Sequence, residues 1–356
     1  MDNTPTPVNS QRILIVTLSG IGNFIMQSPA ISLLKAKFPQ SHITAWVAPR
    51  GTKILAQNHP AIDEVIEAPI KGSLSFHLNL IKTLRQHHFD IGIVLSPGQL
   101  IKSAFYLKAA GIPIRIGNSY PLNSNAHSSL FLTDAVKEDP ALHDIEENIK
   151  ILEPLDIHNP LSLTHYQSHI PDEANHKAQQ WLTQNNLTNT FLIGIHGGSA
   201  PDFLWKRWPL PNFATVAKEL VSKYPQSKIL LFGGKDETEQ KQQLRQLIGQ
   251  DNALIVEADL LTTAALMQHC KLVIANDSGL MHLSAAVGTP TLGLFGPTDE
   301  AKTGPRGTKS YVYRASGTKP TYNTEKNYNL GGNPDASMLA ITPQAVIQKA
   351  ESTLNN

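Results

Sequence analysis

The sequence predicts an α/β fold built from two domains, each with a parallel sheet covered by helices on both faces. Short apolar runs alternate with longer helical stretches, which is the pattern of buried parallel strands joined by crossover helices. The same rhythm restarts near Phe191. A seven-residue phrase also recurs, as KFPQSHI at 37–43 and KYPQSKI at 223–229, each between a predicted helix and a predicted strand. This repetition favours two similar domains.

In the first half, apolar runs predict five strands and the stretches between them predict four helices. The strands are expected at 13–18, 43–49, 62–69, 87–95 and 112–118. The helices are expected at 28–39, 73–86, 100–111 and 143–155. A glycine loop, SGIGN, lies between the first strand and the first helix.

In the second half, 291–296 is predicted to be the last of five strands. The other four are expected at 191–196, 228–234, 253–258 and 271–275, with helices at 211–225, 236–249, 261–270 and 342–354. Past Pro305 the chain becomes polar, so we expect irregular structure up to the final helix. Thr342 is the expected N-cap of that helix, since Pro343 suits its first position.

Composition narrows the classes of function. With 356 residues the chain is long enough for two domains, and its net charge of +1 without a long basic run argues against nucleic-acid binding. The single cysteine, Cys270, excludes an intrachain disulfide and fits a reducing compartment. The polar start lacks a signal-peptide core, and no apolar run approaches the roughly 20 residues that span a bilayer. We therefore expect a soluble, cytosolic protein, unless it docks on a membrane surface.

The stretch NDSGLMH, which follows the strand 271–275, predicts an anion site. Ligands of open parallel sheets bind beyond the carboxyl ends of the strands, and a helix that begins there offers unpaired N–H groups to a phosphate. Ser278 and Gly279 would supply those groups, and His282 lies on the same helix face. Asp277 would orient the loop or accept from a sugar hydroxyl. The alternative is that Asp277 and Ser278 only cap the helix while His282 packs in the core.

Two more loops favour a ligand in the second half. HGGS, at 196–199, is a glycine-rich turn after a strand, and Lys206 and Arg207 follow it closely. Two cations beside two such loops indicate a ligand with more than one phosphate, although a solvated basic pair is the alternative. FGGKDE places Glu237 at a helix start, where it either complements the helix dipole or binds ribose hydroxyls.

These segments together resemble a known family. IHGGS…WKRWP, FGGKDE, NDSGLMHLSAAVGTPTLGLFGPTDEAKTGP and LSGIGNFIMQSPAISLLK are similar to glycosyltransferase family 9, the heptosyltransferase-like enzymes of bacterial lipopolysaccharide assembly. The resemblance implies a GT-B fold, with two Rossmann-like domains that face each other across a cleft. It implies an N-terminal acceptor domain at 1–168, a C-terminal donor domain at 169–335 and a helix at 336–356 that packs back toward the first domain.

The resemblance also assigns site residues. It implies that the donor is bound by Ser199, Lys206, Glu237, Asp277, Ser278, Gly279 and His282. In that assignment Lys206 contacts the donor phosphates and Glu237 the ribose, while Ser278 stands for the family's usual threonine. The acceptor side would be formed by Ser19, Gly20, Gly22 and Arg50.

One departure from the family pattern concerns the catalytic base. The family usually has Gly-Asp where this chain has Gly22-Asn23, and an amide can orient a hydroxyl but cannot accept its proton. Three explanations stay open: Asn23 positions the acceptor and the base lies elsewhere, the protein binds sugar nucleotides with little transfer, or Asn23 caps a helix that begins at Phe24.

The resemblance implies an inverting glycosyltransferase that moves a sugar, expected to be heptose from ADP-heptose, to a saccharide acceptor of lipopolysaccharide or another bacterial glycan. We expect Lys206 to stabilise the departing diphosphate, with no metal and no cofactor besides the nucleotide sugar. The alternatives are a GT-B sugar-nucleotide epimerase and a non-catalytic sugar-nucleotide sensor. A lipid-linked acceptor would imply at most peripheral contact with the inner face of the bacterial inner membrane, and no strongly amphipathic basic helix stands out.

Overall fold

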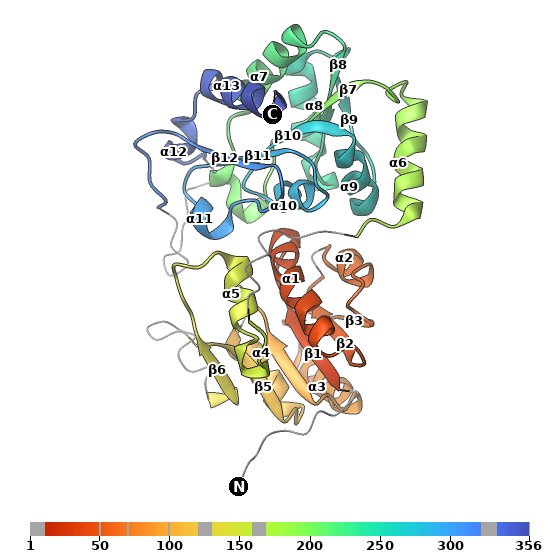
Figure 1. The fold of residues 1–356 in the computed structure, drawn as a ribbon, viewed down its shortest axis with the longest axis vertical. Helices are drawn as coiled ribbons and strands as arrows, with labels where there is room; N and C mark the ends of the chain where they lie inside the picture. The colour runs from red at the N-terminus through yellow and green to blue at the C-terminus, as the bar shows by residue number, and fades with distance from the viewer. Residues whose placement is uncertain are drawn as a thin grey trace. The chain divides into compact units, whose positions relative to one another are not determined.

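The computed structural model describes residues 11–49, 51–69, 71–98, 100–119, 130–158, 169–321 and 333–355. The chain divides into two compact units, Met1–Leu163 and Thr164–Asn356 (Figure 1). This division lies close to the boundary expected at 168, which itself falls outside the described residues.

The first unit is a doubly wound sheet of six strands. The strands are β1 (Arg12–Thr17), β2 (His42–Val47), β3 (Glu64–Glu67), β4 (Ile91–Val94), β5 (Ile114–Ser119) and β6 (Asp134–Lys137). They are ordered β3-β2-β1-β4-β5-β6, and every pair is parallel. Ile13 to Val16 are at most 1% exposed, because helices cover the sheet on both faces.

Five α-helices accompany these strands in the described part of the first unit. They are α1 (Ile21–Lys37), α2 (Lys53–Gln57), α3 (Leu74–Gln86), α4 (Leu100–Ala109) and α5 (Asp144–Lys150), followed by the 3-10 turn η2 (Glu153–Leu155). Apolar side chains of α3 and α4 share one core with Leu14, Val16 and Trp46, so these two helices cover the same face. Helices α1 and α5 pack against each other.

The second unit repeats this topology. Its strands are β7 (Phe191–His196), β8 (Ser227–Leu231), β9 (Ala253–Ile255), β10 (Cys270–Asn276), β11 (Thr291–Phe295) and β12 (Ser310–Arg314). The order β12-β11-β10-β7-β8-β9 is that of the first sheet, again with all pairs parallel. The internal repetition seen in the sequence is thus confirmed as a repeated fold.

The helices of the second unit include those that were predicted, together with α6, α11 and α12, which were not. They are α6 (Asp172–Gln184), η3 (Pro201–Lys206), α7 (Leu210–Lys223), η4 (Lys235–Glu237), α8 (Thr238–Ile248), α9 (Leu260–Gln268), α10 (Gly279–Ala286), α11 (Glu300–Thr303), α12 (Ala336–Leu339) and α13 (Pro343–Leu354). Thr342 is the N-cap of α13, with its side chain accepting from the Ala345 N–H at 3.4 Å, as predicted.

One expectation about the chain's end needs correction. The strand at 291–296 is not the last, because β12 pairs with β11, and part of the chain beyond Pro305 is therefore regular. Within the second unit, α13 packs on α7 and β10, and its Val346 and Ala350 are fully buried in the core. That the segment 336–356 packs back toward the first domain stays a prediction.

Each sheet has a point where the strand order reverses, between β1 and β4 in the first unit and between β7 and β10 in the second. Doubly wound sheets bind ligands beyond the carboxyl ends of the strands at this point. The fold therefore directs attention to the residues that follow β7 and β10, and to those that follow β1 and β4.

Candidate functional site

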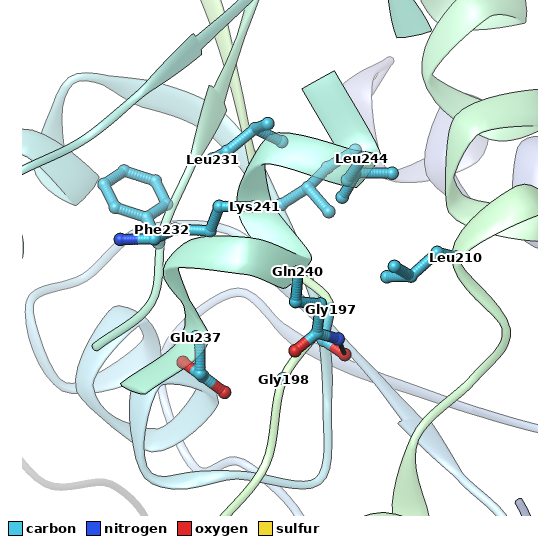
Figure 2. A pocket seen from close by; sticks show the side chains of 10 residues that line it. Gly197, Gly198, Leu210, Leu231, Phe232, Glu237, Gln240, Lys241 and Leu244 are labelled. Carbon is cyan, nitrogen blue, oxygen red and sulfur yellow. Dashed lines mark hydrogen bonds between the residues drawn. The ribbon is translucent and has the colours of Figure 1, made fainter. Parts of the chain in front are cut away.

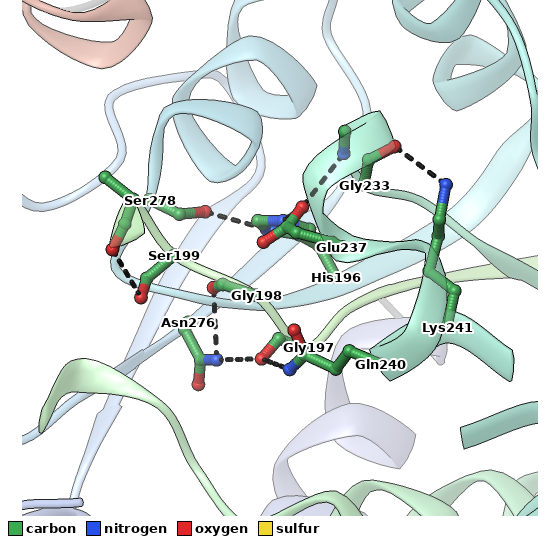
Figure 3. Close-up of polar contacts among 12 residues, drawn as sticks. His196, Gly197, Gly198, Ser199, Gly233, Glu237, Gln240, Lys241, Asn276 and Ser278 are labelled. Atoms are coloured by element: carbon green, nitrogen blue, oxygen red, sulfur yellow. Dashed lines mark hydrogen bonds and ion pairs between the residues drawn. The ribbon is translucent and has the colours of Figure 1, made fainter. Parts of the chain in front are cut away.

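His196 lies at the centre of the polar contacts at the carboxyl edge of the second sheet (Figure 3). It is the last residue of β7, beside Ala275 of β10, and it is 3% exposed. Its Nδ1 lies 2.9 Å from the Ser278 Oγ, and its Nε2 lies 3.2 Å from the Glu237 Oε2. One imidazole therefore joins the loops that follow β7, β8 and β10.

Glu237, predicted as a ribose ligand, is held in its position from several sides. Its Oε2 also accepts from the Gly234 N–H at 2.9 Å, and the Arg207 Nη2 lies 3.8 Å from its Oε1. Burial by itself would raise the pKa of Glu237. The contacts with His196, the Gly234 N–H and Arg207 outweigh that effect and lower the pKa below its usual range, so the side chain is a carboxylate.

The half-buried Lys206 and the buried Asp277 form an ion pair beside the start of α10. The Lys206 Nζ lies 2.6 Å from the Asp277 Oδ2, and Asp277 is 7% exposed. The ammonium also lies 5.2 Å from the ring centroid of Phe203 and 5.6 Å from that of Trp205. Burial would raise the pKa of Asp277, but the charge of Lys206 dominates the neighbours that lower it below its usual value. The pair brings the predicted phosphate-binding cation to the loop after β10.

Helix α10 begins at Gly279, with Ser278 as its N-cap and the Met281 N–H donating to the Ser278 Oγ at 3.3 Å. The capping role that we weighed as an alternative is therefore real, and it is compatible with ligand binding because other first-turn N–H groups still point out of the helix end. His282 is 3% exposed, within electrostatic range of Asp277.

Asn276 and Gln240 fix the glycine loop after β7. The fully buried Asn276 accepts from the Trp208 N–H at 3.0 Å and donates to the Gly197 carbonyl at 2.8 Å. Gln240 donates to the same carbonyl at 2.8 Å (Figure 3). The loop that was predicted to be an anion-ready turn is thus preorganised by side chains from two other segments.

Ser199 and Arg207 brace the same loop. The Ser199 Oγ donates to the Phe203 carbonyl at 2.8 Å and accepts from the Arg207 Nε at 3.0 Å. The Arg207 Nη2 donates to the Ser199 carbonyl at 2.7 Å. Arg207 therefore holds the loop together in the structure, and Ser199, assigned to the donor by resemblance, has its hydroxyl engaged by the protein.

A small pocket lies between β7, β8 and α8 (Figure 2). Its walls include Phe232, Leu244, Gln240 and Lys241. Lys241 is 6% exposed and donates to the Gly233 carbonyl at 3.0 Å. The space inside the pocket is about 10 Å³, room for little more than one water molecule. We therefore interpret it as a packing hollow beneath the loops.

At the carboxyl edge of the first sheet, the loop after β1 leads directly into α1. Gly20 is the N-cap, and the helix begins at Ile21, so Gly22 and Asn23 lie in its first turn. This corrects the explanation that Asn23 caps a helix beginning at Phe24. Asn23 is half-buried, and its side chain makes no hydrogen bond with any residue that the structure describes. Arg50 lies outside the described residues.

Gln27 and Asn148 tie the loops after β1 and β4 together. The fully buried Gln27 accepts from Thr17 and donates to the Ser96 carbonyl at 3.1 Å, with Ser19 Oγ 3.5 Å from its Nε2. Asn148 accepts from the Ser96 N–H at 2.8 Å and donates to the Ser96 carbonyl at 2.7 Å. Ser19, Gly20 and Gly22 therefore lie at the switch point of the first sheet, beside loops that Gln27 and Asn148 hold in place.

Comparison with known proteins identifies the family of this two-sheet protein. A family model described as glycosyltransferase family 9 (heptosyltransferase) matches residues 77–331. The chain belongs to glycosyltransferase family 9. The chain is 28% identical to lipopolysaccharide heptosyltransferase 2 of Escherichia coli K12 over 365 residues, which cover 96% of this chain and 98% of that protein.

Solved structures agree with the GT-B fold expected of a family 9 protein. The crystal structure of a family 9 glycosyltransferase from Veillonella parvula DSM 2008 is 27% identical, covers 97% of each chain and has a TM-score of 0.81. The structure of E. coli ADP-heptose lipopolysaccharide heptosyltransferase II is 24% identical, with a TM-score of 0.77 and coverage of 97% of this chain and 99% of that one. The predicted family and fold class are confirmed, and the epimerase and sensor alternatives are not favoured.

Two further properties of this family 9 enzyme concern metals and membranes. Within the described ranges, His, Cys, Asp and Glu side chains do not gather in a group of three or more that could hold a metal ion. None of the helices in those ranges has the length and apolar character needed to cross a bilayer.

Sequence reasoning missed two residues that organise the carboxyl edge of the second sheet. His196 was seen only as part of a glycine loop, and Asn276 only as the start of the NDSGLMH stretch. Their position in the sequence could have indicated this role, because each is the last residue of a strand at the switch point. A polar residue that ends an otherwise apolar strand there is a candidate for loop organisation.

The lowered pKa of Glu237 predicts that the stability of the fold decreases at acidic pH. A carboxyl whose folded pKa lies below its unfolded value stabilises the fold at neutral pH, and that contribution is lost as the pH falls through the folded value. We expect thermal denaturation followed from pH 7 to pH 3 to show a flatter decline of Tm for Glu237→Gln than for the wild type. Glu239→Gln, on the exposed side of α8, should retain the steep wild-type decline. Parallel curves for Glu237→Gln and wild type would contradict this.

Proposed function

We propose that this chain is an inverting heptosyltransferase that transfers heptose from ADP-heptose to a saccharide acceptor of lipopolysaccharide. The observation that supports this most directly is the second unit's switch point, where Lys206, the start of α10 and Glu237 lie on adjacent loops joined by His196. The printed functions of the family 9 relatives agree with such a site.

In this proposal the donor residues divide between the two ends of the nucleotide sugar. The diphosphate lies against Lys206 and the N–H groups at Ser278 and Gly279, while Glu237 accepts from ribose hydroxyls. Asp277 orients Lys206 through their 2.6 Å contact, and His282 reaches the sugar side from α10. No metal and no cofactor besides the nucleotide sugar is needed, because a fixed ammonium and helix N–H groups can neutralise a diphosphate.

The chemical step follows from these positions. A hydroxyl oxygen of the acceptor attacks the anomeric carbon and forms the glycosidic bond, while the bond from that carbon to the diphosphate oxygen breaks. Negative charge grows on the departing ADP, so Lys206 and the α10 amides stabilise the transition state more than the ground state. The hydroxyl proton leaves to a phosphate oxygen or to water, because Asn23 can orient the hydroxyl but cannot take its proton.

The acceptor side is proposed at Ser19, Gly20, Gly22 and Asn23, together with Arg50. In this proposal the acceptor is linked to lipid and the enzyme works in the cytoplasm, at the inner face of the inner membrane. The absence of a side-chain hydrogen bond from Asn23 to any described residue supports its assignment to the acceptor hydroxyl.

Replacing Asn23 with aspartate tests the missing base. A carboxylate at this position adds a proton acceptor, and general bases typically contribute about 10²–10⁴-fold to rate. We expect Asn23→Asp to raise kcat at least about tenfold, with the rate rising as the pH passes the pKa of the new carboxyl. Donor affinity, measured by calorimetry, should stay unchanged. An unaltered or lower kcat would mean that the native proton acceptor is another group.

The proposed function is tested by mixing the purified protein with a panel of nucleotide sugars, with and without lipopolysaccharide-core acceptors. Release of ADP only when both ADP-heptose and acceptor are present supports the proposal. Conversion of the donor sugar without acceptor would identify an epimerase, and tight binding with no turnover would identify a sensor. Either of those two results would overturn the transferase assignment.

A further inference from the structure

The middle of the first unit is strongly depleted in acidic residues. Between 68 and 133 there are six basic side chains, Lys71, Lys82, Arg85, Lys102, Lys108 and Arg115. The only acid is Asp90, which accepts from the Arg12 N–H at the start of β4. This segment has a formal charge of +5 in a chain whose total is +1, so the rest of the chain has a formal charge of −4.

Helices α3 and α4, which lie in this segment, are neighbours on one face of the sheet. The Tyr106 hydroxyl is hydrogen-bonded to the His77 Nδ1, and the Arg85 Nη2 donates to the Ala109 carbonyl at 2.7 Å. Leu84 of α3 and Leu107 of α4 are fully buried in the same core. Because these contacts join the helices near both ends of α3, their outward sides form one surface.

That surface combines large apolar side chains with cations. Leu74 and Leu78 of α3 are 75% and 58% exposed, and Phe105 of α4 is 47% exposed. Leu78 and Lys82 are one helical turn apart, as are Phe105 and Lys108. We call this the α3–α4 face, and it consists of Leu74, Leu78, Lys82, Lys102, Phe105, Lys108 and Leu130.

Phe105 extends the face toward the segment that precedes β6. Its ring lies 5.7 Å from that of Phe131, and the Lys108 Nζ lies 5.6 Å from the Phe131 ring centroid. Leu130, next to Phe131, is 66% exposed. Within the part of the chain that the structure describes, no carboxylate forms an ion pair with Lys82, Lys102 or Lys108.

We propose that the α3–α4 face docks the first unit on an anionic lipid bilayer. Exposed leucine and phenylalanine side chains enter the boundary between headgroups and acyl chains, while lysines beside them reach the phosphates. Each Lys or Arg near such a surface adds to the electrostatic attraction between the protein and the anionic headgroups. Exposed cations around apolar side chains match a negatively charged membrane, whereas a symmetric dimer through this face would bring two copies of the same positive surface together.

This inference rests on the proposed function only for its purpose, which is to bring the enzyme to a lipid-linked acceptor. The docking itself requires neither donor nor acceptor. It also explains why the sequence indicated no basic amphipathic helix: neither helix is strongly basic alone, and the surface exists only when α3 and α4 lie together.

The experiment is cosedimentation of the full chain with vesicles, without donor or acceptor. We expect binding to vesicles that contain about one third phosphatidylglycerol, little binding to pure phosphatidylcholine, and weaker binding as salt screens the charges. Lys82→Glu combined with Lys102→Glu should lower the partition coefficient at least about tenfold. The matched control, Lys218→Glu with Lys271→Glu, makes the same charge change at exposed positions of the second unit and should bind like the wild type.

A second variant tests the apolar contribution. Leu78→Ser with Phe105→Ser changes exposed side chains, so the fold should persist, and vesicle binding should fall as it does for the lysine variant. Equal binding by wild type and both variants, or no binding to anionic vesicles, would overturn the proposal. So would a wild-type dimer on gel filtration that this variant converts to a monomer, because the face would then be a self-association surface. Transfer to a water-soluble acceptor should be unchanged in all variants. If the wild type showed no such transfer, the proposed heptosyltransferase function would be refuted, but the proposed membrane docking would not.

Discussion

Replacing Lys206 with alanine is expected to lower kcat/KM for transfer about 100- to 1,000-fold, the usual effect of removing one group that stabilises a developing anion. Lys206 is the cation at the start of α10, and its ammonium is already fixed by Asp277 at 2.6 Å and by two aromatic rings. Little reorganisation is needed when charge appears on the diphosphate. Calorimetry with ADP should show a smaller loss of affinity, because the bound diphosphate is also anionic.

The Lys206 substitution also affects stability, and the two effects can be separated. Removing the ammonium leaves Asp277 buried without its partner, which costs about 3–5 kcal/mol for a buried pair. The double variant Lys206→Met and Asp277→Asn removes both charges and keeps an apolar stem beside Phe203 and Trp205. Its Tm should exceed that of Lys206→Ala, while ADP affinity stays low. Wild-type ADP affinity in the double variant would remove Lys206 from the donor site.

Much of the fold could be predicted because central parallel strands are buried on both faces and read as continuous apolar runs. Strands β1, β7 and β10 are of this kind. Strands β6 (DAVK) and β12 (SYVYR) were missed because they are sheet edges with polar, partly exposed side chains. They form strands because they pair with a neighbouring strand, and a local sequence pattern does not show that pairing.

The start of α1 could not be predicted from the residues of the loop alone. Gly20, Ile21 and Gly22 read as a flexible turn, since glycine is a poor helix former. In the structure the helix nevertheless begins at Ile21, which places Asn23 in its first turn. Packing of the helix on the sheet and α5 overrides that local preference, so Asn23 is presented at the edge and does not serve as a cap.

The proposed donor site could be predicted as a set of loops but not as a network. Asp277, Ser278 and Glu237 were selected as candidates because acids and hydroxyls after buried strands are local signals. His196 acts through partners 41 and 82 positions away in sequence, Glu237 and Ser278, so its role follows from the strand order alone. Asn276 likewise contacts Gly197 from 79 positions away.

Gly198→Ala is expected to disrupt this network and weaken ADP binding at least about tenfold. A Cβ at Gly198 would lie 1.6 Å from the Glu237 Oε1 and 2.9 Å from the His196 Nε2 (Figure 2 labels Gly198 and Glu237). The carboxylate must move, so it loses its contacts with His196 and the Gly234 N–H. Overpacking and the loss of hydrogen bonds to a charged group together cost about 3 kcal/mol, which should appear as a lower Tm.

Gly197→Ala provides the matched control one residue earlier. Its nearest neighbour would be the Leu210 Cδ2 at 3.2 Å, the end of a flexible side chain that can shift slightly. We therefore expect Gly197→Ala to stay close to wild type in both Tm and ADP affinity. If Gly198→Ala bound ADP as tightly as Gly197→Ala, Glu237 would not need its observed position, and its assignment to the ribose would fail. If both variants lost ADP binding equally, loop flexibility rather than the His196–Glu237 contact would control the site.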